Sequence, residues 1–411
     1  MSRVTDDAAL VFVDPQAYTD ETRLHAAFAH LRANDPVAWV EASGYNPFWA
    51  ITKYDDIMAV ERANDTFTNS PRPVLATAEQ DEQSAQLGVN TLIHMDDPEH
   101  RKVRAIGADW FRPKAMRALK VRADELAKEH VDKMLAVGNE CDFAQEIAVN
   151  YPLYMIMSLL GVPEADFPLM LRLTQEMFGN ADAEMQRGGD DVLASLMEMF
   201  AYFNDHTAAR RKKPTEDLIS AIANARIDGE PLSDIETVSY YLIVATAGHD
   251  TTSATIAGGL HALIENPDQL HRLQQDPSLI PAATEEMIRW VTPVKHFMRT
   301  AQHDAVVRDT TIAAGESLLL AYPSGNRDED VFDNPMKFDI SRAPNKHVAF
   351  GFGVHFCLGA ALARLELNSF FTELVSRLTS IEMTSQPEWM ATTFVGGIKH
   401  LPIRYELTEP Q

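Results

Sequence analysis

Apolar residues recur at helical spacing along most of this chain. From about residue 98 to residue 380 they return every three or four positions, which is typical of amphipathic helices. Glycine or proline interrupts the pattern at several points, where we expect helices to end. These points are Gly138, Gly161 to Pro163, Gly229 and Asn266-Pro267.

Short strands are expected outside this helical region. Residues 36–40 and 48–52 are rich in aromatic and β-branched side chains and flank Ser43-Gly44, a pattern that predicts a hairpin. Further short strands are expected at Val306-Val307 and at residues 316–320, around the Ala314-Gly315 turn, and at residues 394–401 around Gly396-Gly397. The predicted fold class is therefore α+β, mainly α, with small marginal sheets and one domain over residues 1–411.

The most apolar predicted helix extends from Ser233 to Glu265, about nine turns. It is apolar on most faces between Tyr240 and Leu263, so we expect it to be central. Its middle, residues 247–253, contains a glycine, an acid and three hydroxyl side chains, all of which weaken a helix. Two interpretations stay open: a kinked core helix in which neighbouring hydroxyls satisfy Asp250, or a functional site.

Length and charge exclude several classes. A chain of 411 residues is too long for a small module that disulfides or a metal hold together. The 36 basic and 60 acidic residues give a net charge of −24, which disfavours nucleic acid and anionic membranes as partners. The N-terminus is acidic and no apolar stretch reaches the roughly 20 residues of a membrane span, so we expect a soluble cytoplasmic protein.

Only two cysteines occur, so disulfides do not organise the fold. Cys141 is interpreted as structural. Cys357 follows a loop with glycines at 351 and 353 and precedes a helix expected over residues 360–378, where helix N–H groups favour a thiolate.

Three kinds of chemistry are compatible with such a thiolate. It can be a nucleophile, a zinc ligand together with His347 or His355, or an axial ligand of haem iron. Zinc is disfavoured because no second Cys/His pair has metal-ligand spacing. A catalytic Cys/His pair is disfavoured because His355, two residues away on an extended loop, points elsewhere.

Several motifs resemble those of one family. The sequence Phe350-Gly351-x-Gly353-x-His355-x-Cys357-x-Gly359 resembles the haem-binding loop of the cytochrome P-450 monooxygenases. The further motifs, in the family's order, are Ala247-Gly248-x-Asp250-Thr251-Thr252, similar to its oxygen-activating helix, Glu286-x-x-Arg289, and Phe338-Asp-Ile-Ser-Arg342. Segments 292–300, 324–328 and 394–397 resemble the terpineol-hydroxylase branch in particular.

The resemblance implies a cytochrome P-450 fold, with a long central helix over the haem, and a heme b cofactor. It makes Cys357 the iron ligand, and Asp250 and Thr251 the catalytic pair that delivers protons. The other expected cofactor-binding residues are His100, Arg104, Ala247, Gly248, Arg299, Phe350, His355 and Gly359. The expected substrate contacts are Val244, Ala247, Val294, Phe297, Met298, Phe394 and Val395, and the expected structural residues are Glu286, Arg289 and Arg342.

The implied reaction is hydroxylation of a small apolar compound, such as a monoterpene or an alkyl-aromatic hydrocarbon. It would use O2 and two electrons from an acidic ferredoxin with its NAD(P)H-dependent reductase. Residues 100–122 contain eight bases and one acid, a local charge of +7 that is either a solvated face or the docking site of this ferredoxin. A larger lipid or steroid as substrate is one alternative, and a haem-based gas-binding or sensing protein is another.

Overall fold

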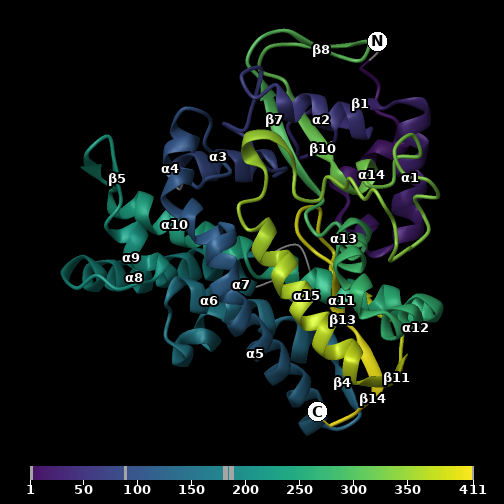
Figure 1. Ribbon diagram of the computed structural model, residues 1–411. Coiled ribbons are helices and arrows are strands. Elements are labelled where there is room, and N and C mark those ends of the chain that lie inside the picture. The colour runs from purple at the N-terminus through teal and green to yellow at the C-terminus, as the bar shows by residue number, and fades with distance from the viewer. Residues whose placement is uncertain (1–2, 88–89, 179–183, 185–188, 410–411) are drawn as a thin grey trace.

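Helices fill the middle of the molecule and small sheets lie at two opposite ends, as the computed structural model shows for residues 3–87, 90–178, 184 and 189–409 (Figure 1). The helices are α1 Glu21–Asn34, α2 Tyr54–Arg62, α3 Ala78–Leu87, α4 Glu99–Ala108, α5 Pro113–Val137, α6 Asn150–Leu160, α7 Phe167–Phe178, α8 Gly189–Lys212, α9 Leu218–Ala223, α10 Asp234–Ala247, α11 Asp250–Glu265, α12 Pro267–Gln275, α13 Ile280–Val291, α14 Tyr322–Gly325 and α15 Ala360–Arg377.

The strands are short. They are β1 Val37–Val40, β2 Phe48–Ile51, β3 Phe67–Thr68, β4 Glu140–Asp142, β5 Arg226–Ile227, β6 Glu230–Pro231, β7 His296–Ala301, β8 Ala305–Val307, β9 Thr310–Ile312, β10 Ser317–Ala321, β11 Leu378–Met383, β12 Glu388–Trp389, β13 Ile398–His400 and β14 Pro402–Leu407. The predicted fold class, α+β and mainly α, is confirmed. No helix within the described ranges is long and apolar enough to span a bilayer.

Most predicted helix ends coincide with observed ones. Gly138 follows α5 with φ 121°, and Gly161 follows α6 with φ 87°, a left-handed conformation that favours glycine. Asn266 ends α11. Gly229 differs, because it lies in the turn between β5 and β6 and has φ 91°.

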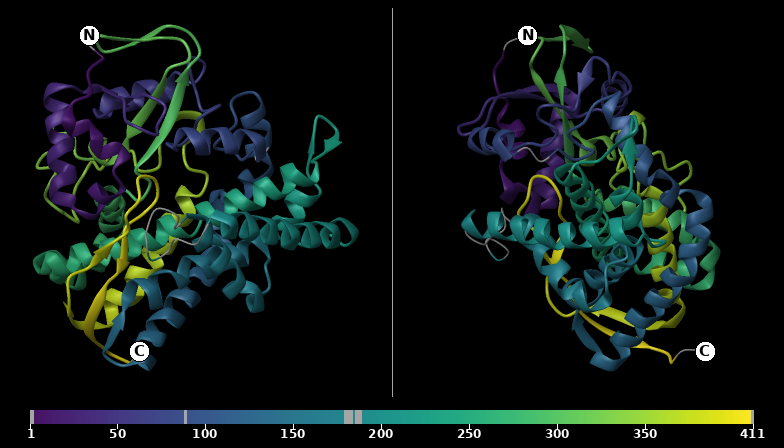
Figure 2. Two further views of the ribbon diagram at one scale, coloured as in Figure 1. Left: turned by 180° about the vertical axis from the view of Figure 1, so that it is seen from behind. Right: turned by 90° about the vertical axis from the view of Figure 1, so that its left-hand side faces the viewer.

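The largest sheet has the order β1-β2-β10-β7-β3 and lies at the end opposite the sheet β11-β14-β4 (Figures 1 and 2). The hairpin predicted for residues 36–52 is confirmed, and Trp39 pairs with Trp49 across it. The strands expected around Ala314-Gly315 both exist but do not pair with each other. Instead β8 pairs with β9, while β10 lies between β2 and β7, because its apolar run is buried on both faces.

Both faces of this sheet are covered. On one face, a cluster that includes Val40, Met298 and Leu319 packs against Phe12 and Phe28 of the N-terminal helices. On the other face, residues such as Trp49 and Leu320 pack against α2. Alternate residues of β7 therefore point to opposite sides.

The helix expected from Ser233 to Glu265 begins and ends as predicted but is broken in its middle. A capping box at Ser233 and Glu236 starts α10, which ends at Ala247, and α11 starts at Asp250. At Gly248, a Cβ atom would lie 2.6 Å from the side chain of Ile156 on α6. The glycine therefore allows α6 to approach closely at the break.

A buried ion-pair cluster connects α13 to the loop that carries Cys357. Both carboxylate oxygens of Glu286 accept hydrogen bonds from Arg289 at 2.8 Å, and Arg342 donates to Glu286 at 3.1 Å. Arg289 also donates to the carbonyl of Asn326, whose side chain accepts from the backbone N–H of Val348. Hydrogen bonds through Asn326 thus connect the cluster to Val348 in the segment that leads to Cys357.

We predict that Glu286→Gln destabilises the protein by about 3–5 kcal/mol, because it leaves the buried guanidinium of Arg289 and the partly buried one of Arg342 without their counter-charge. Guanidinium denaturation measures this loss. Glu285→Gln is the matched control, since Glu285 is partly exposed and pairs with His347 and Arg364. If both variants lose the same free energy of unfolding, the burial of the Glu286 cluster does not increase its contribution to stability.

Candidate active site

A cavity of about 1430 Å³, its open mouth included, lies between α10, α11, α13, β7, α15 and the Cys357 loop. It is lined mainly by apolar side chains, together with one cysteine and several basic residues. The expected site residues that line it are His100, Arg104, Val244, Ala247, Gly248, Thr251, Val294, Phe297, Arg299, Phe350, His355, Cys357 and Gly359. Asp250, Met298, Phe394 and Val395 are not among the lining residues.

Cys357 lies just before α15 in a tightly bent loop. Its backbone N–H donates to the carbonyl of Phe350 at 2.9 Å, and Gly351 and Gly353 have φ angles of 66° and 71°. A Cβ atom on Gly353 would lie 2.6 Å from the carbonyl oxygen of Glu61. The glycines are therefore required for the bend that brings the sulfur into the cavity.

Burial raises the pKa of Cys357 above its ordinary value. The backbone N–H groups of Gly359 and Ala360 and the cations Arg104 and Arg364 oppose this rise without cancelling it. The backbone N–H groups therefore favour the thiolate, as expected, while desolvation disfavours it. Offsetting this desolvation calls for a cation bonded to the sulfur.

Haem iron fits this requirement better than zinc. Within the described ranges, no group of three potential metal ligands includes Cys357. His347 interacts with Glu285 at 3.1 Å instead. A single sulfur in a large cavity suits an iron whose other ligands come from a macrocycle.

Cationic side chains gather at one rim of the cavity. The rings of His100 and His355 lie 4.0 Å apart, and Arg104 donates to the carbonyl of Phe356 at 2.6 Å. Burial, together with repulsion from His100, Arg299 and Arg104, lowers the pKa of His355 to about 2. The guanidinium groups of Arg104 and Arg299 carry positive charge, so two carboxylates placed beside them would be favoured. The two haem propionates match this need.

Glu61, on α2, also lines this rim, and the sequence analysis missed it. It accepts hydrogen bonds from Tyr322 at 2.7 Å and from Arg299 at 3.2 Å, while its second carboxylate oxygen has no partner. Burial raises the pKa of Glu61 to about 7. Along the chain it looks like an ordinary helix acid, and only its long-range contacts distinguish it.

Hydroxyl side chains line the α11 side of the cavity. Thr251 and Thr252 both face it, and the hydroxyl of Thr251 donates to the carbonyl of Ala247 at 3.2 Å across the helix break. Glu366 of α15, which the sequence analysis also missed, lines the same region and is fully buried. Burial raises its pKa well above the ordinary value, against the opposing effect of Thr252. Burial thus favours the protonated form of Glu366 over its carboxylate.

Asp250 lies behind this surface, next to His249. Its Oδ1 is 3.0 Å from Nδ1 of His249, whose Nε2 is 2.7 Å from the carbonyl of Val149. Burial alone would lower the pKa of His249, but the Asp250 carboxylate and the Val149 carbonyl outweigh it and raise this pKa. His249 is thus the ion-pair partner of Asp250, which precedes Thr251 in the chain.

The expected substrate contact Met298 requires correction. Phe297 and Arg299 line the cavity, whereas Met298 lies between them on β7 and points to the opposite face, where it is fully buried in the sheet core. Strand alternation is the reason. Phe394 and Val395 lie one layer behind the lining: Phe394 packs edge-on against Phe297 with ring centres 5.6 Å apart, and Val395 pairs with Val294.

Most bases of the basic segment 100–122 are already ion-paired. The observed pairs are Arg101 with Asp97, Lys102 with Asp228, Arg112 with Asp109, Lys120 with Asp124, and Arg122 with Glu164. Lys114 and Arg117 form no ion pair with any described residue. They lie near the start of α5. Arg104, earlier in the same basic segment, donates to the carbonyl of Phe356 in the Cys357 loop.

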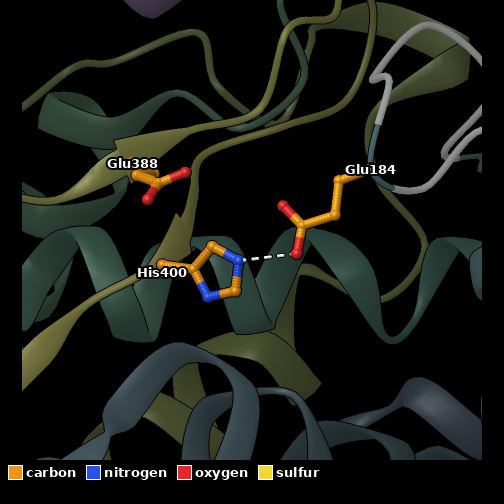
Figure 3. A group of neighbouring side chains, drawn as sticks. All are labelled: Glu184, Glu388 and His400. Atoms are coloured by element: carbon orange, nitrogen blue, oxygen red, sulfur yellow. Dashed lines mark hydrogen bonds and ion pairs between the residues drawn. The ribbon is translucent and has the colours of Figure 1, made fainter.

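A second cluster with metal-ligand geometry is located elsewhere. Glu184, Glu388 and His400 face one another at the surface (Figure 3). Lys399 lies 3.0 Å from Glu184, and His400 interacts with both Glu184 and Asp142. Ion pairs thus account for the cluster without a metal.

Three comparisons relate the chain to known proteins. The family model for Cytochrome P450 matches residues 145–407. Cytochrome P450-terp of a Pseudomonas species is 40% identical over 98% of this chain and 98% of its own length. A methyl-branched lipid omega-hydroxylase of Mycobacterium tuberculosis is 34% identical over 97% of this chain and 95% of its own.

A solved structure agrees with these relatives. The crystal structure of CYP108D1 from Novosphingobium aromaticivorans superimposes with a TM-score of 0.92 at 40% identity, covering 99% of this chain and 100% of that one. Sequence similarity along nearly the whole length and the shared architecture lead to one conclusion: this chain belongs to the cytochrome P450 family.

Proposed function

We propose that this cytochrome P450 monooxygenase hydroxylates a small apolar compound, such as a monoterpene or an alkyl-substituted aromatic hydrocarbon. The observation that carries the proposal is the apolar wall near Thr251, formed by Ile243, Val244, Ala247, Val294 and Phe297. These side chains present no charge to a ligand. Binding energy would then come from buried hydrocarbon, at about 25 cal/mol per Å².

Cys357 is the proposed iron ligand, and His100, Arg104, Arg299 and His355 are the proposed partners of the haem propionates. When bound, haem supplies the redox chemistry by which O2 is activated, and the thiolate promotes O–O cleavage. The Gly351 and Gly353 bends hold the sulfur in place, and the Glu286 cluster supports the loop behind it.

Proton delivery is assigned to side chains of α11. The Thr251 hydroxyl faces the cavity and can pass a proton while it accepts another. The His249–Asp250 pair, one residue away, is the proposed source from which Thr251 is reprotonated. Glu366, whose burial favours its protonated form, lies next to Thr252 and is a second proposed proton store.

Similarity to Cytochrome P450-terp at 40% identity supports a terpene-sized substrate. The lipid hydroxylase at 34% identity supports the alternative of a longer lipid. The cavity volume alone admits both, so the choice depends on ligand binding.

Substrate class is tested by the spin state of the ferric protein. We expect p-cymene and α-terpineol to shift it at micromolar concentrations, because they fill an apolar cavity and displace water. Palmitic acid and cholesterol should leave it unchanged. The reverse result would assign the enzyme to larger lipids, and shifts without any hydroxylated product would favour a gas-binding protein.

Thr251→Ala should retain substrate binding but divert consumed O2 to hydrogen peroxide. Product formed per reductant consumed should fall about tenfold, because the hydroxyl that organises proton transfer is lost. Thr251→Ser keeps a hydroxyl and should restore most of the coupling. Unchanged coupling in the alanine variant would contradict this role.

The proposed electron donor is an acidic ferredoxin that docks at Lys114 and Arg117. Reversing both charges to glutamate should slow haem reduction about tenfold at low salt and weaken its salt dependence. Arg23→Glu with Lys213→Glu changes the net charge equally at exposed sites on other elements and serves as control. If both double variants behave alike, the segment is only a solvated face.

A further inference from the structure

The imidazole of His296, the first residue of β7, connects two segments that flank the cavity wall. Its Nδ1 is 2.9 Å from the carbonyl oxygen of Thr393, and its Nε2 is 3.0 Å from the backbone nitrogen of Leu75. The three residues are far apart in the sequence, and His296 is only 1% exposed. The ring is thus a buried cross-link between residues near 75 and residues near 393.

The hydrogen bonds determine the ring's protonation state. The amide of Leu75 is a donor, so Nε2 must accept, and Nδ1–H must then donate to Thr393. Burial lowers the pKa of His296 to about 4, and Arg72 contributes to this shift against the Thr393 carbonyl. The neutral ring with its proton on Nδ1 satisfies both bonds at once.

Backbone bonds hold the two segments to the strand on either side of His296. The N–H of Met298 donates to the carbonyl of Pro73 at 2.7 Å, and the N–H of Lys295 donates to that of Phe394 at 2.7 Å. The His296 side chain adds one further hydrogen bond to each of these two segments.

The same ring contacts the aromatic wall. The Phe394 ring lies 5.4 Å from the His296 ring and 5.6 Å from the Phe297 ring, and Phe297 lines the cavity. Phe394 therefore supports Phe297 from behind, and His296 holds both Phe394 and the segment that carries it.

We propose that His296 is a positioning residue for specificity, which fixes Phe394 behind Phe297 and so sets the width of the cavity. The inference rests on the proposed function only in taking this cavity as the substrate site. It does not depend on which substrate binds. A purely structural histidine would change stability alone, whereas a positioning histidine changes the preference of the cavity for ligands of different size.

Azoles test the proposal on the haem-loaded enzyme, because their nitrogen binds haem iron whatever the natural substrate is. Imidazole has no side group to meet the wall, whereas 4-phenylimidazole carries a ring into the apolar cavity. His296→Phe removes both hydrogen bonds. His296→Asn retains a donor near the Nδ1 position, and His296→Gln retains an acceptor near the Nε2 position. His130→Phe is the control, since His130 is another buried histidine, bonded to the Leu126 carbonyl within α5.

In His296→Phe we expect the dissociation constant of 4-phenylimidazole to rise about tenfold relative to that of imidazole, with Asn and Gln intermediate. His130→Phe should leave this ratio within about twofold of the wild type, whatever its stability. A ratio in His296→Phe that matches the His130→Phe control would overturn the proposal.

Hydrogen exchange gives a readout that needs no ligand. The Leu75 amide should exchange about tenfold faster in His296→Phe and His296→Asn, but not in His296→Gln, which still offers an acceptor. Unchanged exchange at Leu75 in His296→Phe would show that the ring does not hold this segment, and would refute the cross-link. Failure of terpenes to shift the spin state would instead count against the proposed function and leave both of these measurements valid.

Discussion

The burial of the Cys357 sulfur, which the proposed function makes a thiolate ligand of haem iron, is the constraint on which this structure depends. Desolvation raises the pKa of Cys357, and the nearby N–H groups and arginines oppose this rise. The fold places the sulfur in the wall of a cavity where the proposed metal macrocycle would bind. It also places cationic groups at the rim, where the acid groups of that macrocycle would neutralise them.

The constraint explains features that are distant in sequence. The loop must be rigid, so glycines bend it against α2, and the Glu286, Arg289 and Arg342 cluster supports it through Asn326 and Val348. In the proposed function, the opposite wall stays apolar yet supplies protons. A broken central helix meets both needs, because the break at Gly248 and His249 exposes Thr251 to the cavity while His249 and Asp250 stay behind it.

Much of this arrangement was predictable from the sequence. The resemblance of local motifs to those of the cytochrome P-450 monooxygenases implied the Cys357 loop, the acid–alcohol pair and the cationic residues. Hydrophobic spacing predicted most helix ends and the first hairpin. Met298 was assigned wrongly because a motif read along the chain does not show which face of a strand each residue occupies. Glu61 and His296 were missed because their roles arise from contacts at least 97 residues away in the sequence. Glu366 was missed because its role arises from its complete burial.

The reduced protein with carbon monoxide tests the central claim most directly. Thiolate ligation predicts a strongly red-shifted Soret band in the wild type, since a charged sulfur donates electron density to the iron. Cys357→His should replace this band with a histidine-type spectrum, and Cys141→Ala should leave it intact. A histidine-type spectrum in freshly prepared, folded wild-type protein, or a red-shifted band that survives in Cys357→His, would contradict the account.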